Sequence, residues 1–267
     1  MSKLRIINDS SVDQEVDAIV NAANKYLLGG NGVCGAIFKK AGYEKLTEYC
    51  SKIKTPLQDG EAVITPAFDI ENTKYIIHAV GPNFNITPDS FDNLLNAYYN
   101  SLTLLRDNEL HSISFPLISA GIYGGKLSNP VSTSTTKCIE AYNLFKEENP
   151  DYDIDVLLCA FTEKEYLEAK RKESLSITEE TEKEEAQLKE EIAKLKGELD
   201  ARTLAAYEKV RENTNNGFAV VTVQRDACGG CFNKIPPQRQ LDIAMNKKII
   251  VCEYCGRILV SADFMRE

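Results

Sequence analysis

Short apolar runs alternate with longer amphipathic stretches through the first 172 residues of the chain. Apolar or β-branched runs bounded by polar and turn-forming residues are typical of buried strands. Between them, apolar positions recur at the spacing of a helix that covers one face of a sheet. Six strands are predicted, at Leu4–Ile7, Ala18–Ala22, Ala62–Thr65, Tyr75–Val80, Ile113–Ile118 and Ile154–Ala160. Five helices are predicted, at Val33–Ala41, Tyr43–Lys52, Asp89–Arg106, Pro130–Lys146 and Glu163–Lys172.

This alternation predicts an α/β domain with three layers. Parallel strands joined by helical crossovers are covered on both faces, so we expect a mixed, mostly parallel sheet between two layers of helices. A ligand site in such a fold is expected at the carboxyl edge of the strands. Two glycine-rich turns fall at that edge, one after Ala18–Ala22 and one after Ile113–Ile118.

Each glycine-rich turn closes an apolar strand and opens a helix. The first contains Gly29-Gly30-Asn31-Gly32-Val33-Cys34, and the second contains Ser119-Ala120-Gly121-Ile122-Tyr123-Gly124. A bare backbone ahead of a helix presents free N–H groups and the positive end of the helix dipole to an anion. Two such turns at one sheet edge predict a clamp on a diphosphate, and therefore a nucleotide-diphosphate ligand.

The composition changes sharply near residue 173. Residues Glu173 to Asp200 include ten acidic and four basic side chains, a net charge of −6. Leu188, Ile192, Leu195 and Leu199 follow one another at spacings of four, three and four, the start of a heptad pattern. Two heptads leave two interpretations open: a solvated linker helix, or a short coiled coil that forms a weak dimer or an intramolecular hairpin. We predict a charged helical linker over residues 173–215.

Two C-x-x-C pairs follow in a third segment, residues 216–267. Cys228 and Cys231 are separated by 20 residues from Cys252 and Cys255. Two such pairs at this spacing supply the four thiolates of a tetrahedral Zn²⁺ site, and four thiolates leave no open position for water. The sequence therefore predicts structural zinc. Disulfides are the alternative, which a reducing compartment disfavours.

Charge and composition exclude several classes of protein. The 267 residues carry a formal net charge of −9 with a pI near 5.0, which argues against a general nucleic-acid or anionic-membrane binder. No run of 18 apolar residues occurs, and residues 1–6 lack the pattern of a signal peptide, so a cytoplasmic location without a membrane partner is expected. Cys34, Cys50, Cys138 and Cys159 are expected to be reduced and buried.

Four ordered motifs make residues 3–172 resemble a macrodomain, the ADP-ribose-binding fold. They are Val20–Asn24, Gly29–Phe38, Tyr75–Pro82 and Ser119–Gly124. The resemblance implies a three-layer α/β/α domain that binds ADP-ribose or an ADP-ribosylated protein and requires no cofactor.

The resemblance also implies roles for individual residues. Asp9 matches the acid that accepts a hydrogen bond from the adenine amino group, and Asn24 matches the asparagine that binds the distal ribose. Tyr123 packs against the distal sugar, and Phe161 lies near the adenine unless it belongs to the core. The full set of implied ligand-binding residues is Asp9, Ser10, Ala22, Asn24, Gly30, Asn31, Gly32, Val33, Cys34, Ser119, Ala120, Gly121, Ile122, Tyr123 and Phe161.

Two positions depart from the family pattern. Asn31 interrupts the glycine run, and we expect it to be tolerated because asparagine accepts positive φ better than other side chains. Cys34 stands where hydrolases of this family carry an aspartate that helps to activate water. A nucleophilic Cys34 at a helix N-terminus is the less favoured alternative, because no histidine is adjacent in sequence. His78 falls in the middle of a strand and is expected to be a core residue.

The segment from about residue 204 to residue 263 resembles a bacterial C4-type zinc-ribbon family. The matching text includes Gly217–Val221, Cys228–Pro237 and Cys252–Leu259. In that family the ribbon follows a long helical hairpin, which is here cut to about 40 residues. Seven basic and five acidic residues in 218–267, with −2 from a tetrathiolate zinc, give a net charge near zero. A protein partner is therefore expected in preference to nucleic acid.

Taken together, these features predict an ADP-ribose-binding protein that hydrolyses mono-ADP-ribosyl esters or O-acetyl-ADP-ribose. The resemblance to macrodomains implies that Asn24 is then the catalytic residue, which orients the distal ribose while the diphosphate of the substrate itself positions the water. Two alternatives remain at this point. One is a reader that binds ADP-ribose without chemistry, and the other is an interaction protein in which the ribbon dominates.

Overall fold

The computed structural model describes residues 2–214, 217–245 and 247–261, apart from the side chains of residues 179 and 180. The chain divides into two compact units, Met1–Thr181 and Glu182–Glu267. The division falls inside one long helix, α5 (Glu163–Gly197), and each unit is treated separately below. Among the described residues, no helix combines the length and the apolar character needed to cross a bilayer.

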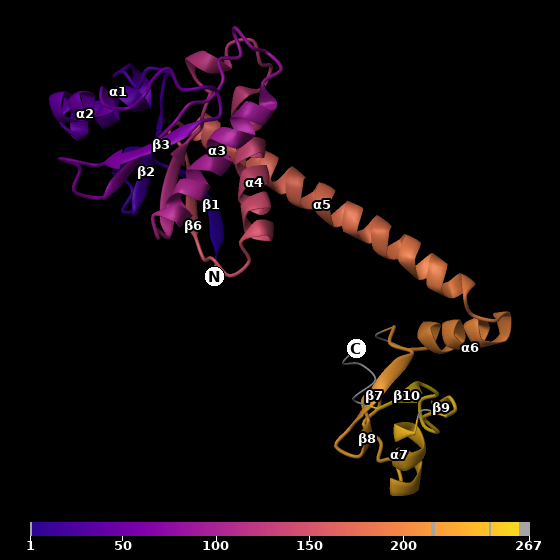
Figure 1. Cartoon of the computed structure of the whole chain (residues 1–267). Coiled ribbons are helices and arrows are strands. Elements are labelled where there is room, and N and C mark those ends of the chain that lie inside the picture. The colour runs from indigo at the N-terminus through magenta and orange to yellow at the C-terminus, as the bar shows by residue number, and fades with distance from the viewer. Residues whose placement is uncertain (1, 215–216, 246, 262–267) are drawn as a thin grey trace. The chain divides into compact units, whose positions relative to one another are not determined.

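The first unit is built on a six-stranded sheet (Figure 1). Its strands are β1 (Lys3–Asn8), β2 (Ala18–Ala22), β3 (Ala62–Pro66), β4 (Tyr75–Ala79), β5 (Ser112–Pro116) and β6 (Asp155–Ala160). They lie in the order β1-β6-β5-β2-β4-β3, and every neighbouring pair is parallel except β3 and β4. The prediction of a mixed, mostly parallel sheet is confirmed.

Helices cover both faces of this sheet. The four main ones are α1 (Gly32–Lys40), α2 (Tyr43–Cys50), α3 (Phe91–Asp107) and α4 (Pro130–Glu148). Successive residues of a strand point to opposite faces, so Ile19 packs in one apolar cluster with Phe38 of α1, and Val20 packs in the other with Tyr98 of α3. The three-layer arrangement follows from strands that are apolar on both faces.

The predicted end of the fifth helix at Lys172 is wrong, because α5 continues to Gly197. Glutamate, lysine, alanine and leucine are good helix formers, and neither glycine nor proline occurs between residues 163 and 196. The change in composition near residue 173 is therefore no break in structure. The helix ends at Gly197, and α6 (Ala201–Glu212) begins after Asp200. The Asp200 carboxylate caps α6, because it accepts hydrogen bonds from the N–H groups of Arg202 and Thr203.

The second unit carries a small four-stranded sheet in the order β8-β7-β10-β9. Its elements are β7 (Val220–Gln224), β8 (Ala227–Cys228), α7 (Pro237–Ala244), β9 (Ile250–Val251) and β10 (Ile258–Val260). A two-residue turn with positive φ at Arg225 and Asp226 joins β7 to β8, as tight hairpins require. Its buried apolar cluster has six described members, of which two are Cys228 and Cys252. So small a core needs another source of stability.

The sheet of the first unit opens between β2 and β5. These strands pair only at Ala18–Ile113 and Ile19–Ser114, whereas β2 pairs with β4 over five residues. The short helix η1 (Ser11–Asp13) lies next to this gap, where the Ser114 hydroxyl donates to the Ser11 carbonyl at 2.7 Å. The sheet therefore leaves a crevice at its carboxyl edge, where the chains that leave β2 and β5 separate.

His78 is a core residue, as predicted. The imidazole lies in β4 with none of its surface exposed, between the Asn21 amide nitrogen (3.0 Å from Nδ1) and the Thr65 hydroxyl (3.1 Å from Nε2). Because the Asn21 amide donates to Nδ1, the ring is neutral and carries its hydrogen on Nε2. Burial lowers the pKa of His78 to about 4.

This depressed pKa makes the stability of the first unit depend on pH. Between about pH 6.5 and pH 4, His78 is protonated in the unfolded chain but stays neutral in the folded chain. The free energy of unfolding therefore falls as the pH falls. We expect a loss of about 3 kcal/mol from this group across that window. Urea unfolding followed by circular dichroism at a series of pH values measures it. A His78→Gln variant should show a flatter profile, and equal slopes for the two proteins would contradict the assignment.

Candidate functional site

A cavity of about 620 Å³ lies at the carboxyl edge of the six-stranded sheet. The segments that follow β1, β2, β5 and β6 form its wall. These four strands are neighbours in the sheet order β1-β6-β5-β2, so residues that are far apart in sequence meet at one edge. Its volume falls in the range of small-molecule sites.

The structure brings all of the predicted ligand-binding residues to the wall of this cavity. They are Asp9, Ser10, Ala22, Asn24, Gly30, Asn31, Gly32, Val33, Cys34, Ser119, Ala120, Gly121, Ile122, Tyr123 and Phe161. Lining residues that sequence reasoning missed are Ser11, Val12, Ala23, Ala36, Pro116, Leu117, Cys159 and Glu165. Most of these are sequence neighbours of predicted residues. Glu165 had a signal of its own, since it lies three residues after Thr162 at the start of a helix.

Asn24 holds the first loop in shape. Its side-chain oxygen accepts from the backbone N–H groups of Tyr26 (3.1 Å) and Leu28 (3.2 Å), and its amide nitrogen donates to the Leu28 carbonyl at 2.6 Å. The amide nitrogen has two hydrogens, so one N–H is left for a ligand. Asn24 thus shapes the loop and also lies on the cavity wall.

The backbone of the first loop runs directly over the start of α1. A Cβ atom at Gly35 would lie 2.5 Å from the Gly30 carbonyl oxygen, so only glycine permits this approach. Gly32 carries the positive φ of the loop, at 63°, while Asn31 has φ −99°. The loop therefore accommodates Asn31, as expected, although its tolerance of positive φ is not used there. The first N–H groups of α1 have no partner within the helix and lie at its positive end.

The second loop depends on a strained residue. Ser119 has φ 56°, in the left-handed region that non-glycine residues avoid, and its hydroxyl donates to the Pro82 carbonyl at 2.8 Å. A Cβ atom at Gly81 would lie 2.4 Å from that hydroxyl, so Gly81 makes room for it. Strained residues of this kind cluster at functional sites. The turn continues into the short helix η2 (Ile122–Gly124).

A closed hydrogen-bond ring in the core anchors the start of this loop. The Ile118 N–H donates to the Tyr98 hydroxyl at 2.9 Å, and the Ser134 hydroxyl donates to the Ile118 carbonyl at 2.7 Å. The Tyr98 and Ser134 oxygens lie 2.7 Å apart, so the tyrosine hydroxyl donates to the serine. Both polar backbone groups of Ile118 are satisfied by side chains from α3 and α4, in a fully buried setting.

Phe161 and two carboxylates lie at the other end of the cavity. Phe161 is 77 % exposed, so the alternative that assigned it to the core is wrong. Asp9 is exposed and accepts from the Ser10 N–H at 2.7 Å, and Glu165 accepts from the N–H and hydroxyl of Thr162 as part of the cap of α5. An exposed aromatic face beside carboxylate acceptors suits a planar ring that carries an amino group.

Cys34 is a protonated thiol. It is 6 % exposed, and its sulfur lies 3.7 Å from the Leu28 carbonyl that also accepts from Asn24. Burial raises the pKa of Cys34, outweighing the nearby hydrogen-bond donors. The argument that the helix N-terminus activates this thiol is therefore wrong. Cys50, Cys138 and Cys159 are likewise buried and unpaired by disulfides, as expected.

Electrostatics at the cavity come from the backbone. Asp9 and Glu165 are its acidic lining residues, both on the β1 and β6 side, and neither lysine nor arginine occurs among the lining residues that the structure describes. An anion held here would have to be bound by uncharged donors, which are backbone N–H groups and polar side chains such as Asn31, together with the dipole of α1. The β2 and β5 side, which carries no charged side chain among those residues, is the part of the cavity suited to it.

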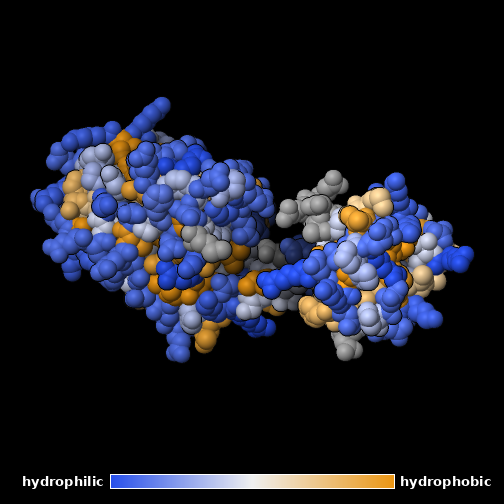
Figure 2. Space-filling view, turned by 90° about the horizontal axis from the view of Figure 1, so that it is seen from below, coloured by the Kyte–Doolittle hydropathy of each residue, from blue (hydrophilic) through white to orange (hydrophobic). Residues whose placement is uncertain are grey.

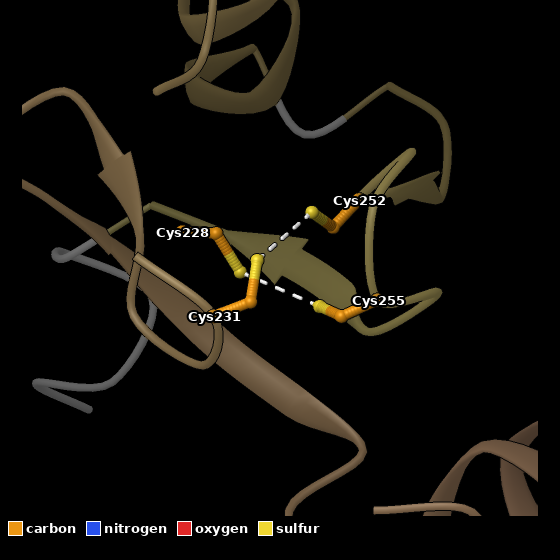
Figure 3. A group of neighbouring side chains, drawn as sticks. All are labelled: Cys228, Cys231, Cys252 and Cys255. Atoms are coloured by element: carbon orange, nitrogen blue, oxygen red, sulfur yellow. Dashed lines mark hydrogen bonds between the residues drawn. The ribbon is translucent and has the colours of Figure 1, made fainter. Parts of the chain in front are cut away.

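The second unit contains the four cysteines as one cluster (Figure 3). Their sulfurs all lie within 4.8 Å of one another, with Cys228 and Cys255 at 3.8 Å and Cys231 and Cys252 at 3.6 Å. Zn–S bonds of about 2.3 Å in a tetrahedron place sulfurs about 3.8 Å apart. The cluster therefore fits a tetrahedral zinc ion.

Backbone geometry around the cysteines suits thiolates. The Gly230 N–H donates to the Cys228 sulfur at 3.4 Å, and the Asn233 amide donates to the Cys231 sulfur at 3.5 Å. A side chain at Gly229 would lie 2.6 Å from the Thr222 carbonyl, and Gly256 has φ 71°. Glycine is therefore required at both of these positions. These four thiolates are the ligands of a structural zinc.

Comparison with known families divides the chain in the same way. Residues 20–144 match the sequence model described as Macro domain, and residues 227–259 match the model described as C4-type zinc ribbon domain. A macro domain-containing protein of Caldanaerobacter subterraneus is 47 % identical over 126 residues, which are 46 % of this chain and 71 % of that protein. The human ADP-ribose glycohydrolase MACROD2 is 34 % identical over 216 residues, 78 % of this chain and 48 % of its own length. This chain thus spans about half of that relative.

Solved structures give the same result. The Oceanobacillus iheyensis macrodomain with ADP superposes with a TM-score of 0.60 at 34 % identity, covering 67 % of this chain and 93 % of that one. The Trypanosoma brucei macrodomain in complex with ADP-ribose superposes with a TM-score of 0.55 at 32 % identity, covering 63 % and 68 %.

The hydrogen-bond ring around Ile118 generates a stability prediction. A Tyr98→Phe variant leaves the Ile118 N–H buried without an acceptor, so we expect unfolding of the first unit to become easier by about 1–3 kcal/mol. Tyr99→Phe, one residue along α3, removes a hydroxyl that contacts Glu148 at the surface, and it should cost much less. Urea unfolding of both variants measures the difference. Equal effects would show that the ring does not anchor the loop.

The zinc centre predicts separable stability of the two units. Cys252→Ser, or a strong chelator, should remove the metal and unfold the small sheet while the first unit keeps its own unfolding transition. Metal analysis should give about one zinc per intact chain, and circular dichroism with limited proteolysis should locate the unfolding. A metal-free chain with an intact second unit would contradict a structural role.

Proposed function

Because this chain belongs to the macrodomain family and carries a C4-type zinc ribbon, we propose that its first unit binds ADP-ribose in the cavity at the sheet edge. Names of similar proteins support this proposal: one is an ADP-ribose glycohydrolase, and a solved neighbour is in complex with ADP-ribose. The observation that carries it is the pair of loops after β2 and β5, which offer backbone N–H groups in a cavity wall without lysine or arginine among the described residues.

The two ends of the cavity fit the two ends of such a ligand. A diphosphate suits the α1 terminus and the second loop, where N–H groups and a helix dipole supply the positive potential. Adenine suits the other end, where it would stack on Phe161 and donate its amino hydrogens to Asp9. The distal ribose then lies beside Asn24, whose remaining N–H is available for it.

We further propose that the cavity hydrolyses mono-ADP-ribosyl esters or O-acetyl-ADP-ribose. The Cys34 thiol is protonated, and none of the described lining residues on the Asn24 side is a carboxylate, so these residues offer no strong general base there. Neither histidine lines the cavity: His78 is buried in β4, and His111 precedes β5 at the opposite edge of the sheet. A diphosphate oxygen of the substrate would accept the proton of the attacking water, while Asn24 holds the sugar. For a mono-ADP-ribosyl ester, the water oxygen would bond to the anomeric carbon of the distal ribose while the bond from that carbon to the carboxylate oxygen breaks and the carboxylate leaves. For O-acetyl-ADP-ribose, the water oxygen would bond to the acetyl carbon, and the ribose oxygen would leave as a hydroxyl after it takes the proton back from the diphosphate.

A reader that binds ADP-ribose without chemistry is the second candidate. The observation that favours it is Cys34 itself, a neutral thiol that shares the Leu28 carbonyl with Asn24 and leaves water activation to the substrate. The same cavity would then serve recognition alone. Both candidate functions require that ADP-ribose binds, but only the hydrolase releases a product.

For the second unit we propose an interaction module with a protein partner. Its described surface includes apolar side chains that no core requires, such as Phe218 (62 % exposed), Phe232 (75 %) and Tyr254 (71 %). Figure 2 shows apolar residues in orange on this unit, among hydrophilic ones in blue. The net charge of this segment, counted with zinc bound, is near zero, so it offers no electrostatic attraction to the phosphates of a nucleic acid. A cytoplasmic location remains a prediction from composition.

A product assay separates the enzyme from the reader. The full chain is incubated with a protein ADP-ribosylated on glutamate, and free ADP-ribose is quantified while binding of ADP-ribose is measured by calorimetry. We expect release by the natural chain and a loss of about tenfold or more in rate for Asn24→Ala. The matched control is Asn108→Ala, which removes a capping amide at the exposed end of α3, remote from the cavity.

The outcomes are distinct. Tight binding without release supports the reader. A rate that Asn24→Ala does not change would remove the proposed role of Asn24. If calorimetry detects no heat of binding at millimolar ADP-ribose, both candidate functions of the first unit would be overturned. The zinc ribbon would then be the functional part of the chain.

A further inference from the structure

The end of α5 and the residues just after it carry four apolar side chains that stay about half exposed in the described structure. Leu188, Ile192, Leu195 and Leu199, here called the leucine stripe, are 58 %, 43 %, 55 % and 46 % exposed. Leu188, Ile192 and Leu195 lie near the end of α5, and Leu199 follows two residues after the helix ends at Gly197; all four belong to the second unit. A solvated helix has no physical need of a regular apolar stripe, whereas a helix that pairs with another one does.

The helix that follows does not cover the stripe. Contact between α6 and the end of α5 includes an ion pair of 2.6 Å between Lys196 and Glu208. The half-exposed side chains of α6 include Leu204 and Tyr207, yet the stripe residues keep about half of their surface. An intramolecular hairpin across the stripe is therefore absent from the described structure.

Charges beside the stripe select one kind of partner. With Leu188 and Leu195 at d positions of a heptad and Ile192 and Leu199 at a positions, the g positions are Glu184 and Glu191 and the e positions are Lys189 and Lys196. In two parallel helices in register, each g residue faces the e residue of the next heptad on the other helix. Glutamate then meets lysine at every such contact.

An antiparallel pair would reverse this result. There g residues face g residues and e residues face e residues, so glutamate would meet glutamate and lysine would meet lysine. Isoleucine at an a position with leucine at d also favours two parallel strands. Glu185 occupies the preceding a position and Asp200 follows the last one, so the apolar seam is limited to two heptads.

We propose that the leucine stripe is a self-association surface, and that its partner is a second copy of this chain with the two α5 helices parallel and in register. The short seam makes the dimer weak and dependent on concentration. The pair Glu184–Lys189 is the best test of register, because Lys196 already pairs with Glu208. Lys189 has only an exposed contact with Glu185, at 3.0 Å, which contributes little.

Sedimentation velocity of the full chain over a wide concentration range tests the surface. The natural chain should shift from monomer to dimer as the concentration rises, and Leu195→Asp should remain a monomer. Gln187→Asp is the matched control, since it adds the same charge to the same helix at an exposed position off the stripe, and it should behave as the natural chain. Circular dichroism and zinc content verify that each variant is folded.

Charge reversal tests orientation and register without touching the apolar residues. Glu184→Lys and Lys189→Glu should each weaken the dimer about three- to tenfold, and an equimolar mixture of the two should recover it, because each lysine then meets a glutamate. A monomer at every concentration, a dimer indifferent to Leu195→Asp, or a mixture no tighter than its components would each overturn the proposal.

Discussion

The closed ring of hydrogen bonds among Ile118, Tyr98 and Ser134 is the interaction on which the first unit depends. It joins the end of β5 to α3 and α4 inside the core, where an unpaired backbone group would be costly. With Ile118 fixed, the next residue, Ser119, is held in the left-handed region against the Pro82 carbonyl. The shape of the second loop is therefore decided by a buried residue whose two neighbours, Leu117 and Ser119, line the cavity.

This anchoring explains how the cavity can offer an anion site without cationic side chains. Backbone N–H groups bind an anion well only when they are held in place beforehand, since a flexible loop would lose entropy on binding. Asn24 holds the first loop and the ring holds the second. The same arrangement constrains the proposed hydrolysis: among the described lining residues, the side near Asn24 has a neutral thiol and no carboxylate, so proton transfer would depend on the substrate. Binding and catalysis thus have different requirements at this one sheet edge.

The second unit obtains its order from another source. Its apolar cluster is small and includes two of the zinc ligands, so metal binding and folding are one event there. The long helix α5 is stabilised in another way, by helix propensity and by local ion pairs such as Lys189–Glu185. Its stability does not depend on burial of the leucine stripe, which stays exposed. The leucine stripe, which this chain does not bury against itself, is available to a second chain. The glutamates and lysines beside the stripe favour a second copy of the same chain in the proposed dimer.

Sequence alone determined the three-layer fold, the position of the cavity and the zinc ligands, because each rests on local patterns: apolar periodicity, glycine turns after strands and cysteine spacing. Sequence did not reveal the length of α5, since a change in composition is no barrier to a helix. Nor did it identify the positive φ at Gly32 and Ser119, the protonated state of Cys34, or the exposure of Phe161. Those properties depend on which segments meet in space. Burial, close approach of backbones and shared hydrogen-bond partners exist only once strands far apart in the chain lie side by side.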